Sequence, residues 1–134
     1  MSGKFLKQYI KDYSDLILPE SDLINTLIQV KDALVTASEN GKKVIIVGNG
    51  GSAAMASHVS IDLTKNAGIR SINFNESDLI TCFANDYGYE HWVEKAVEYY
   101  GDEGDIFIGI SSSGASENIL NGCRAAREKN FSKV

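Results

Sequence analysis

Apolar residues recur at steps of three and four residues through the N-terminal part of the chain. The first such series is Leu6, Ile10, Tyr13 and Ile17. This spacing predicts an amphipathic helix, which should end before Pro19. A second series over residues 23–37 predicts another helix. Ser21 or Asp22 could cap its start, and Gly41 could close its end. The apolar faces of the two helices could pack on their own domain or on another subunit, and the sequence leaves both possibilities open.

From residue 41 onward, short apolar runs alternate with helical segments. The runs that we interpret as buried parallel strands are 44–47, 70–74 and 105–110. The segments that we interpret as helices are 52–64, 77–83, 89–100 and 118–129, with a loop over 85–88. This alternation predicts a three-layer α/β fold with an open parallel sheet. We expect one domain over residues 1–134, with N-terminal helices over 1–40 and an α/β core over 41–134. The core should be incomplete at its C-terminus, because the chain ends where the next strand would begin.

The first strand runs into the glycine turn Gly48-Asn49-Gly50-Gly51, and a helix should begin near Ser52. Backbone N–H groups and the positive end of a helix dipole make such a turn a site for anions. The spacing Gly48-x-Gly50-x-x-Ala53 also fits the loose dinucleotide pattern. That pattern requires an acidic residue after the second strand, where this chain has Asn73-Phe74-Asn75. A turn that needs glycine only for its backbone conformation is a third interpretation.

The third strand runs into a serine turn that carries four hydroxyls directly before a helix. They belong to Ser111, Ser112, Ser113 and Ser116. Hydroxyl and N–H groups at a helix start can donate hydrogen bonds to phosphate oxygens. One serine would be explained as a helix cap, but four exceed what capping needs. A nucleophilic serine is less well supported, because no Gly-x-Ser-x-Gly motif is present. Since ligands bind at the carboxyl ends of parallel strands, we expect the two turns to lie side by side there.

His58 and Asp62 are a candidate metal pair on the helix after the glycine turn. They are four residues apart, so they share one face of that helix and could bind one divalent metal. A hydrogen bond between the two side chains on the helix surface is the alternative explanation. Two ligands do not complete a zinc site, and no other nearby pair supplies the rest.

The composition excludes several classes of function. The net charge is −5 and Lys and Arg are not clustered, which argues against a nucleic-acid partner. No apolar run is long enough to span a membrane. The first 11 residues lack a signal-peptide pattern, so we expect a cytoplasmic protein. Cys82 and Cys123 form neither a disulfide framework nor a metal or redox motif.

Three motifs together resemble the sugar isomerase (SIS) domain family. They are Gly48-Asn49-Gly50-Gly51-Ser52-Ala53-Ala54 with a following histidine, Ala84-Asn85-Asp86-Tyr87-Gly88, and Gly109-Ile110-Ser111-Ser112-Ser113-Gly114-x-Ser116-x-Asn118. Within that family the chain resembles the phosphoheptose isomerases, which act on sedoheptulose 7-phosphate. The resemblance implies a flavodoxin-like parallel sheet, a homotetramer with active sites at subunit contacts, and a zinc-assisted isomerisation. The product would be a D-glycero-D-manno-heptose 7-phosphate for lipopolysaccharide or capsule.

The resemblance also implies roles for individual residues in binding the substrate. The residues that would contact it at the glycine turn are Asn49, Gly50, Gly51 and Ser52. The residues that would bind its hydroxyls are Asn85 and Asp86. The residues that would hold its phosphate are Ser111, Ser112, Ser113 and Ser116.

The metal site implied by the resemblance is only partly matched. His58 would be a zinc ligand, and Asp62 stands where the family has a glutamate that is both metal ligand and catalytic base. An aspartate carboxylate sits about 1.5 Å further back than that of glutamate. The family's other zinc ligands, a glutamine and a histidine, come from a strand-and-helix segment that would follow position 134.

Two classes of function therefore stay open. In the first, the chain is an isomerase: Asp62 removes a proton next to the sugar carbonyl, and a cation stabilises the enediolate. In the second, it is a non-catalytic SIS module that binds a phosphosugar or only a protein partner. SIS-type replication-initiator-binding and regulatory proteins are of this second kind. His58 and the two turns favour the isomerase, whereas Asp62 and the expected missing segment favour the module.

Overall fold

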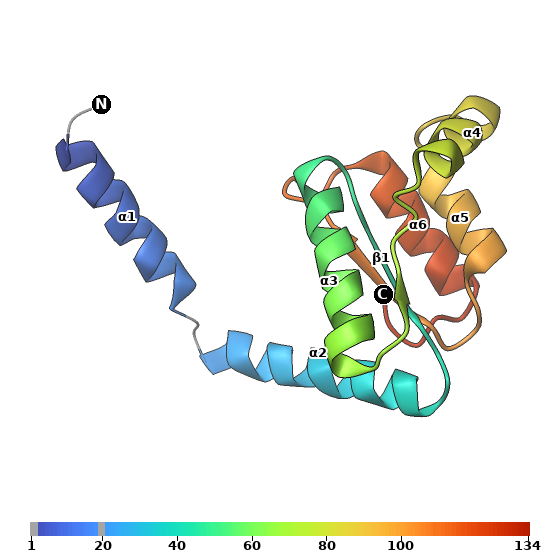
Figure 1. Ribbon diagram of the computed structural model, residues 1–134, viewed down its shortest axis with the longest axis horizontal. Helices are drawn as coiled ribbons and strands as arrows, with labels where there is room; N and C mark the ends of the chain where they lie inside the picture. Colours follow the sequence, from blue (N-terminus) through green and yellow to red (C-terminus); the bar gives the residue numbers. More distant parts are fainter. Residues whose placement is uncertain (1–2, 19–20) are drawn as a thin grey trace. The chain divides into compact units, whose positions relative to one another are not determined.

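The computed structural model describes residues 3–18 and 21–134 (Figure 1). The elements in chain order are α1 (Gly3–Ile17), α2 (Ser21–Glu39), β1 (Val44–Gly48), α3 (Gly51–Ala67), β2 (Ser71–Ile72), α4 (Ser77–Tyr87), α5 (Trp92–Tyr100), β3 (Ile106–Ile110) and α6 (Glu117–Glu128). The chain divides into two compact units, Met1–Asp32 and Ala33–Val134. The prediction of a single domain over the whole chain stays a prediction.

The first unit consists of α1 and the first part of α2. The helix predicted from the first apolar series is confirmed and ends at Ile17. Pro19 itself lies outside the described residues. None of the α1 side chains is buried within the chain. The large apolar residues that α1 exposes are Phe5, Leu6, Tyr9, Ile10, Tyr13, Leu16 and Ile17.

The second unit is built on an open parallel sheet with the strand order β2-β1-β3. β1 lies in the middle, pairing Val44 with Ser71 of β2 and with Ile106 of β3. The pairing with β3 continues to the last residues of both strands, Gly48 and Ile110. The predicted α/β fold with an open parallel sheet is therefore confirmed. In the described part of the chain, no helix is long and apolar enough to cross a membrane.

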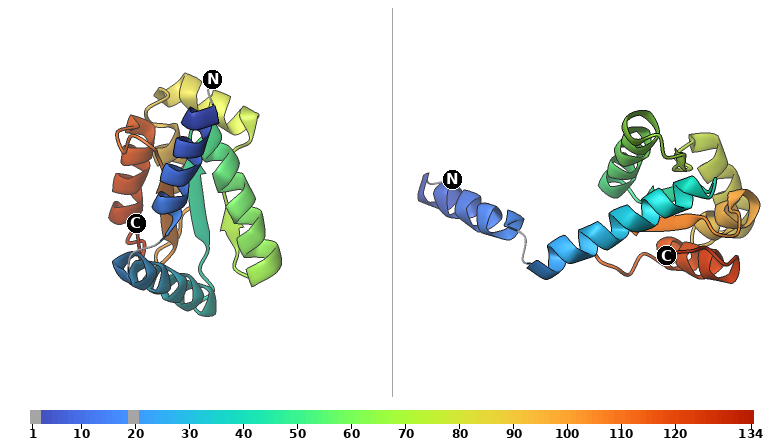
Figure 2. Two further views of the ribbon diagram at one scale, coloured as in Figure 1. Left: turned by 90° about the vertical axis from the view of Figure 1, so that its left-hand side faces the viewer. Right: turned by 90° about the horizontal axis from the view of Figure 1, so that it is seen from below.

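Successive residues of β1 point into two separate cores, because side chains alternate across a strand. Ile45 and Val47 pack with α5 and α6. Val44 and Ile46 pack with the end of α2 and with α3. Figure 2 shows α3 and α6 on opposite sides of the sheet. A strand that is buried on both faces explains the uninterrupted run of aliphatic residues in β1.

The second strand is shorter than the sequence predicts. We expected residues 70–74, but β2 contains only Ser71 and Ile72. Phe74 has a positive φ of 58°, which is incompatible with extended pairing. Asn73 instead accepts a hydrogen bond from the backbone N–H of Asn75 at 3.0 Å and turns the chain.

The prediction of a loop over residues 85–88 is wrong for residues 85–87, which are helical. α4 continues through Tyr87, because the ring of Tyr87 packs against Phe83 one turn earlier. Gly88 then ends the helix with a φ of 92°, and its N–H donates to the carbonyl of Ala84. The next helix begins at Trp92 rather than at residue 89.

The chain turns back along the sheet after α6. Lys133 forms a parallel bridge with Ile106, and its carbonyl accepts from the N–H of Phe107 at 3.0 Å. The N–H of Ser132 donates to the carbonyl of Asp105 at 2.8 Å. The final described residues thus lie beside β3, on the edge that β1 does not use.

Candidate functional site

The glycine turn brings the start of α3 very close to the end of β1. A Cβ on Gly48 would lie 2.6 Å from the backbone carbonyl carbon of Ser52, so a larger residue would force the backbone of the turn to shift. Gly50 occupies the cap position of α3 with a φ of 55°, and no side chain caps the helix. No heavy atom outside its chain neighbours and its own helix backbone lies within 4 Å of the Cβ position of Gly51. In the first turn of α3, the N–H groups of Ser52 and Ala54 donate to the carbonyls of Asn49 and Gly50, so the N–H groups that could meet an anion are those of Gly51 and Ala53.

The hydroxyls of the serine turn converge on one another. Ser111 Oγ lies 3.4 Å from Ser113 Oγ and 3.2 Å from Ser116 Oγ. Ser113 Oγ also accepts a hydrogen bond from the backbone N–H of Ala115 at 3.1 Å. Ser116 is the N-cap residue of α6, but its side chain makes no capping hydrogen bond. Capping therefore does not account for Ser116, and the grouped hydroxyls offer several donors to an oxyanion. The remaining serine of the turn, Ser112, is exposed.

The two turns lie side by side, as the sequence predicts. Gly48 and Ile110 are paired in the sheet, so Asn49 and Ser111 are the next residues along neighbouring strands. The starts of α3 and α6 lie at the same end of the sheet, at the top of Figure 1. Ligands of open parallel sheets bind outside this end.

A network of hydrogen bonds joins the two turns. Asn49 Nδ2 donates to Asn118 Oδ1 at 3.0 Å, and Asn118 Nδ2 donates back to Asn49 Oδ1 at 2.8 Å. The Tyr89 hydroxyl donates to the same Asn49 oxygen at 3.1 Å. Asn118 belongs to the serine-turn motif, but the sequence alone assigns it no role. Tyr89 was missed altogether, because no sequence pattern connects it with the glycine turn.

Asn85 and Asp86 lie on the last turn of α4, at the same end of the second unit as the two turns (Figure 1). Both side chains are exposed. Asn85 Nδ2 donates to Asp86 Oδ1 at 2.9 Å, and Cys82 Sγ donates to Asp86 Oδ2 at 3.7 Å. Among the residues that the structure describes, no hydrogen bond links this pair to either turn. The amide and carboxylate could bind sugar hydroxyls, and that role stays a prediction.

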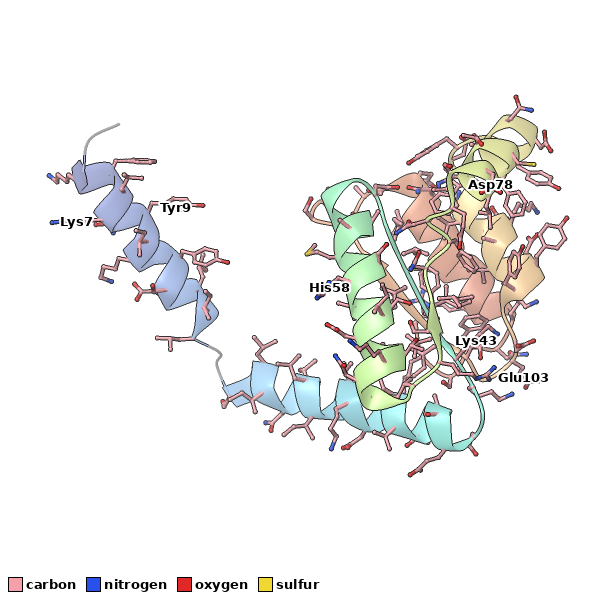
Figure 3. All side chains as sticks on the ribbon, in the orientation of Figure 1. Lys7, Tyr9, Lys43, His58, Asp78 and Glu103 are labelled. Carbon is pink, nitrogen blue, oxygen red and sulfur yellow. The ribbon has the colours of Figure 1, made fainter. Side chains whose placement is uncertain are left out.

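His58 and Asp62 form the contact that their spacing predicts. His58 Nε2 lies 3.4 Å from Asp62 Oδ2, and Asp62 also accepts from Asn66 Nδ2 at 3.1 Å. The side chains are 82% and 50% exposed, and Figure 3 shows His58 on the side of α3 away from the sheet. From Gly51 they lie roughly 10 and 16 Å along the helix axis. Two adjacent donors fit two positions of a zinc shell. The described residues contain no group of three His, Cys, Asp or Glu that could hold a metal.

The segment that follows β2 does not support a dinucleotide site. Asn75 Nδ2 donates to the Ala53 carbonyl at 2.9 Å and to Ser57 Oγ at 2.6 Å. This amide therefore ties the segment after β2 to α3. A ribose would require a carboxylate at this point, so the dinucleotide interpretation finds no support in the geometry.

Tyr87 on α4 and Cys123 on α6 both have shifted pKa values. The Tyr99 side chain, through its hydrogen bond, holds the pKa of Tyr87 above its ordinary value. Burial raises the pKa of the Cys123 thiol on α6. Both groups are therefore neutral at neutral pH, and neither adds charge near the serine turn.

Comparison with known proteins places these motifs in a family. The sequence model of the SIS domain matches residues 8–132. The phosphoheptose isomerase of Aneurinibacillus thermoaerophilus is 33% identical, covering 97% of this chain and 70% of that protein. The phosphoheptose isomerase of Sulfurimonas denitrificans is 36% identical, covering 98% of this chain and 72% of that protein. The solved phosphoheptose isomerase from Neisseria gonorrhoeae superposes with a TM-score of 0.83 at 27% identity, covering 96% of this chain and 70% of that one.

Proposed function

The chain belongs to the SIS domain family, and we propose that it acts as a phosphoheptose isomerase that converts sedoheptulose 7-phosphate into D-glycero-D-manno-heptose 7-phosphate. The product would serve the synthesis of lipopolysaccharide or capsule heptose. One observation carries the proposal beyond the similarity itself: the reciprocal hydrogen bonds of Asn49 and Asn118 hold the glycine turn against the helix of the serine turn. A phosphate and the sugar attached to it would thus meet both turns at once.

The serine turn is the proposed phosphate site. The hydroxyls of Ser113 and Ser116 lie 3.4 and 3.2 Å from the hydroxyl of Ser111, and all three come shortly before α6. Hydrogen bonds to a charged phosphate are stronger than those between neutral groups. With the phosphate held there, the sugar would reach Asn49, Gly50, Gly51 and Ser52 at the neighbouring strand end. Asn85 and Asp86 would bind its hydroxyls.

The isomerisation moves a carbonyl from C2 to C1 of the sugar. A base must remove a proton from C1, and a proton must then return to C2 of the enediolate. Asp62 is the proposed base, and it lies next to His58 on α3. His58 and Asp62 would also hold a zinc ion, which when bound would stabilise negative charge on the sugar oxygens. The remaining zinc ligands are not among the described residues.

The proposed function also includes an assembly and a location in the cell. The resemblance to the SIS family implies a homotetramer, and the large apolar side chains that α1 and the first part of α2 expose support association of some kind. The cytoplasm is the proposed location, in keeping with the similarity to enzymes named phosphoheptose isomerases. The non-catalytic SIS module is not favoured, because the relatives reported above are all named phosphoheptose isomerases.

Calorimetric titration with sedoheptulose 7-phosphate tests the proposed phosphate site. Replacing Ser113 and Ser116 together by alanine should weaken binding by about 1–3 kcal/mol, through the loss of charge-assisted hydrogen bonds. Ser14→Ala is the matched control, because its hydroxyl donates within α1 to the carbonyl of Ile10. Equal affinity of the double variant and the parent chain would remove the serine turn from the proposed site.

A further inference from the structure

The two groups that surround the side chain of Asn49 determine what it can offer to a ligand. Asn49 Oδ1 accepts from Asn118 Nδ2 at 2.8 Å and from the Tyr89 hydroxyl at 3.1 Å. An amide oxygen has two lone pairs, so this oxygen is fully occupied. Asn49 Nδ2 donates one of its two hydrogens to Asn118 Oδ1 at 3.0 Å. One N–H of the Asn49 amide is left for a ligand, and no acceptor is left.

We propose that Asn118 and Tyr89 are positioning residues, which hold the Asn49 amide so that it donates its remaining N–H to a sugar oxygen of the substrate. The inference rests on the proposed function, because a bound phosphosugar is what gives this donor its target. It goes beyond that function by naming two residues that need not touch the substrate.

Asn118 is a fixed partner because the fold encloses it. Asn118 is only 3% exposed as a whole residue, and it lies on the first turn of α6 next to the buried Ile119. The amide of Asn118 therefore has little freedom to rotate. If Asn118 lost Asn49 as its partner, the buried amide of Asn118 would be left without these two hydrogen bonds, which costs about 1–3 kcal/mol.

Tyr89 is held by the same helix from a second direction. Asn121 Nδ2 on α6 donates to the carbonyl of Glu90 at 2.8 Å, which ties the chain next to Tyr89 to α6. The N–H of His91 donates to the carbonyl of Gly88 at 3.0 Å and closes this short turn. The ring of Tyr89 also contacts that of Trp92, with 6.5 Å between the centroids. The hydroxyl that selects the orientation of the Asn49 amide is thus itself anchored.

A donor is the group that the proposed chemistry needs at this place. When a proton leaves the carbon next to the carbonyl, negative charge develops on the sugar oxygen. A hydrogen-bond donor that is already oriented stabilises such charge without reorganisation, whereas an acceptor would repel it. A donor aimed at the sugar also distinguishes a sugar phosphate from a phosphate ion, which the serine turn alone does not.

Titration calorimetry with two probes, sedoheptulose 7-phosphate and inorganic phosphate, tests the inference on the full chain. Asn118→Ala and Tyr89→Phe should each weaken sugar phosphate binding about 3- to 10-fold, the value of one neutral hydrogen bond. Both should leave the affinity for inorganic phosphate unchanged. Tyr99→Phe is the matched control, because the Tyr99 hydroxyl contacts Tyr87 and not Asn49. A loss of equal size for both probes would indicate a merely structural role and overturn the inference.

A double-mutant cycle shows whether Asn118 acts through Asn49. In an Asn49→Ala background, Asn118→Ala should cause no further loss of sugar phosphate affinity. An undiminished loss in that background would overturn the positioning role. The side-chain NH₂ resonances of Asn49, observed by NMR without ligand, should shift in Tyr89→Phe and stay in place in Tyr99→Phe. Unshifted resonances in Tyr89→Phe would likewise contradict the inference.

The same experiments separate this inference from the proposed function. If the parent chain binds sedoheptulose 7-phosphate no better than inorganic phosphate, the proposed function fails and the donor role fails with it. If the parent chain prefers the sugar phosphate and the variants keep that preference, the proposed function stands and only the positioning role is overturned.

Discussion

Lys43 Nζ lies 2.5 Å from a carboxylate oxygen of Asp105, and the two side chains are only 12% and 1% exposed. The backbone N–H of Lys43 donates to the other carboxylate oxygen at 2.9 Å. The N–H of Asp102 donates to the same carboxylate at 2.9 Å, and the Asp102 side chain pairs with Lys43 Nζ at 2.6 Å. This charged cluster joins the residue before β1 to the residue before β3, at the end of the sheet opposite the two turns.

Replacing Lys43 by methionine should strongly destabilise the fold. The substitution leaves the buried Asp105 carboxylate without its counter-charge, and breaking such a buried pair costs about 3–5 kcal/mol. The two backbone N–H donors that remain should keep the loss near the lower value. Urea unfolding followed by circular dichroism measures the free energy of unfolding. Lys11→Met is the control, since Lys11 and Asp15 form an exposed pair worth at most about 1 kcal/mol. Equal losses for the two variants would contradict the assignment.

The stability of the fold at acidic pH should depend on the Asp102 carboxylate. The hydrogen bond from Lys43 lowers the pKa of Asp102 below its ordinary value of 3.8. The contribution of this carboxylate to stability is therefore complete above that value and is lost as the pH falls through the lower pKa of the folded state. Asp102→Asn should flatten the dependence of the free energy of unfolding on pH below about pH 4. An unchanged slope in that range would speak against the shifted pKa.

The metal pair should bind zinc weakly by itself. His58 and Asp62 supply two donors, whereas catalytic zinc usually has three protein ligands. We therefore expect the 134 residues to bind zinc weakly and to isomerise sedoheptulose 7-phosphate slowly or not at all. A longer chain that also carries the glutamine and histidine of the family should gain both properties together. Zinc titration and a turnover assay on both chains measure this.

Asp62 should be essential in such an active chain. Asp62→Asn should abolish turnover but leave phosphosugar binding nearly intact, because an amide cannot take up the proton and the serine turn is unchanged. Asp62→Glu should keep or raise the rate, since it restores the reach of the family's glutamate. Turnover of Asp62→Asn at the parent rate would show that another group is the base.

The exposed face of α1 should mediate association. Light scattering should find a dimer or tetramer at micromolar concentration. Leu6→Glu combined with Ile10→Glu should lower the measured mass, because both side chains are exposed and apolar in the single chain. Lys7→Glu changes charge on the same helix without removing apolar surface and should leave the mass unchanged. A parent chain that is monomeric would exclude the proposed assembly.

Gly48→Ala should disrupt the proposed anion site at the start of α3. The added Cβ would lie 2.6 Å from the backbone of Ser52, so the start of α3 would have to move away from β1. We expect weaker sedoheptulose 7-phosphate binding and a loss of about 1–3 kcal/mol in stability, as for other overpacked positions. Gly3→Ala is the control, because nothing lies within 4 Å of the Cβ position there. Binding at the parent level would show that α3 can shift without affecting the site.

The parts of the fold that follow from local periodicity could be predicted from the sequence. Trp92, Val93, Ala96 and Val97 are all buried, as their spacing on one helix face indicates. The parts that tertiary contacts decide could not. Asn85-Asp86-Tyr87 has the composition of a turn, yet Phe83 packs against Tyr87 and also against Tyr99 of α5. These ring contacts extend α4 against its local propensity.

Part of the candidate site could likewise be predicted from the sequence. Strand-turn-helix motifs identify the glycine and serine turns, and the parallel sheet places them together. The i, i+4 spacing also predicts the contact of His58 with Asp62. The bonds of Asn49 with Asn118 and Tyr89 depend on strand register and on the path of the chain before α5. Neither is encoded in a local pattern, so these partners emerge only from the structure.

The pairing of Asn49 with Asn118 connects residues 69 positions apart in the chain. No short segment can therefore form the site, and a ligand that needs both turns binds the native state but not the unfolded chain. Ligand binding and folding are thermodynamically linked in such a case: a phosphosugar at 100 times its dissociation constant should stabilise the native state by about 2.7 kcal/mol. The midpoint of thermal unfolding should rise with the concentration of the true substrate, which turns a melting curve into a screen for the sugar that this chain recognises.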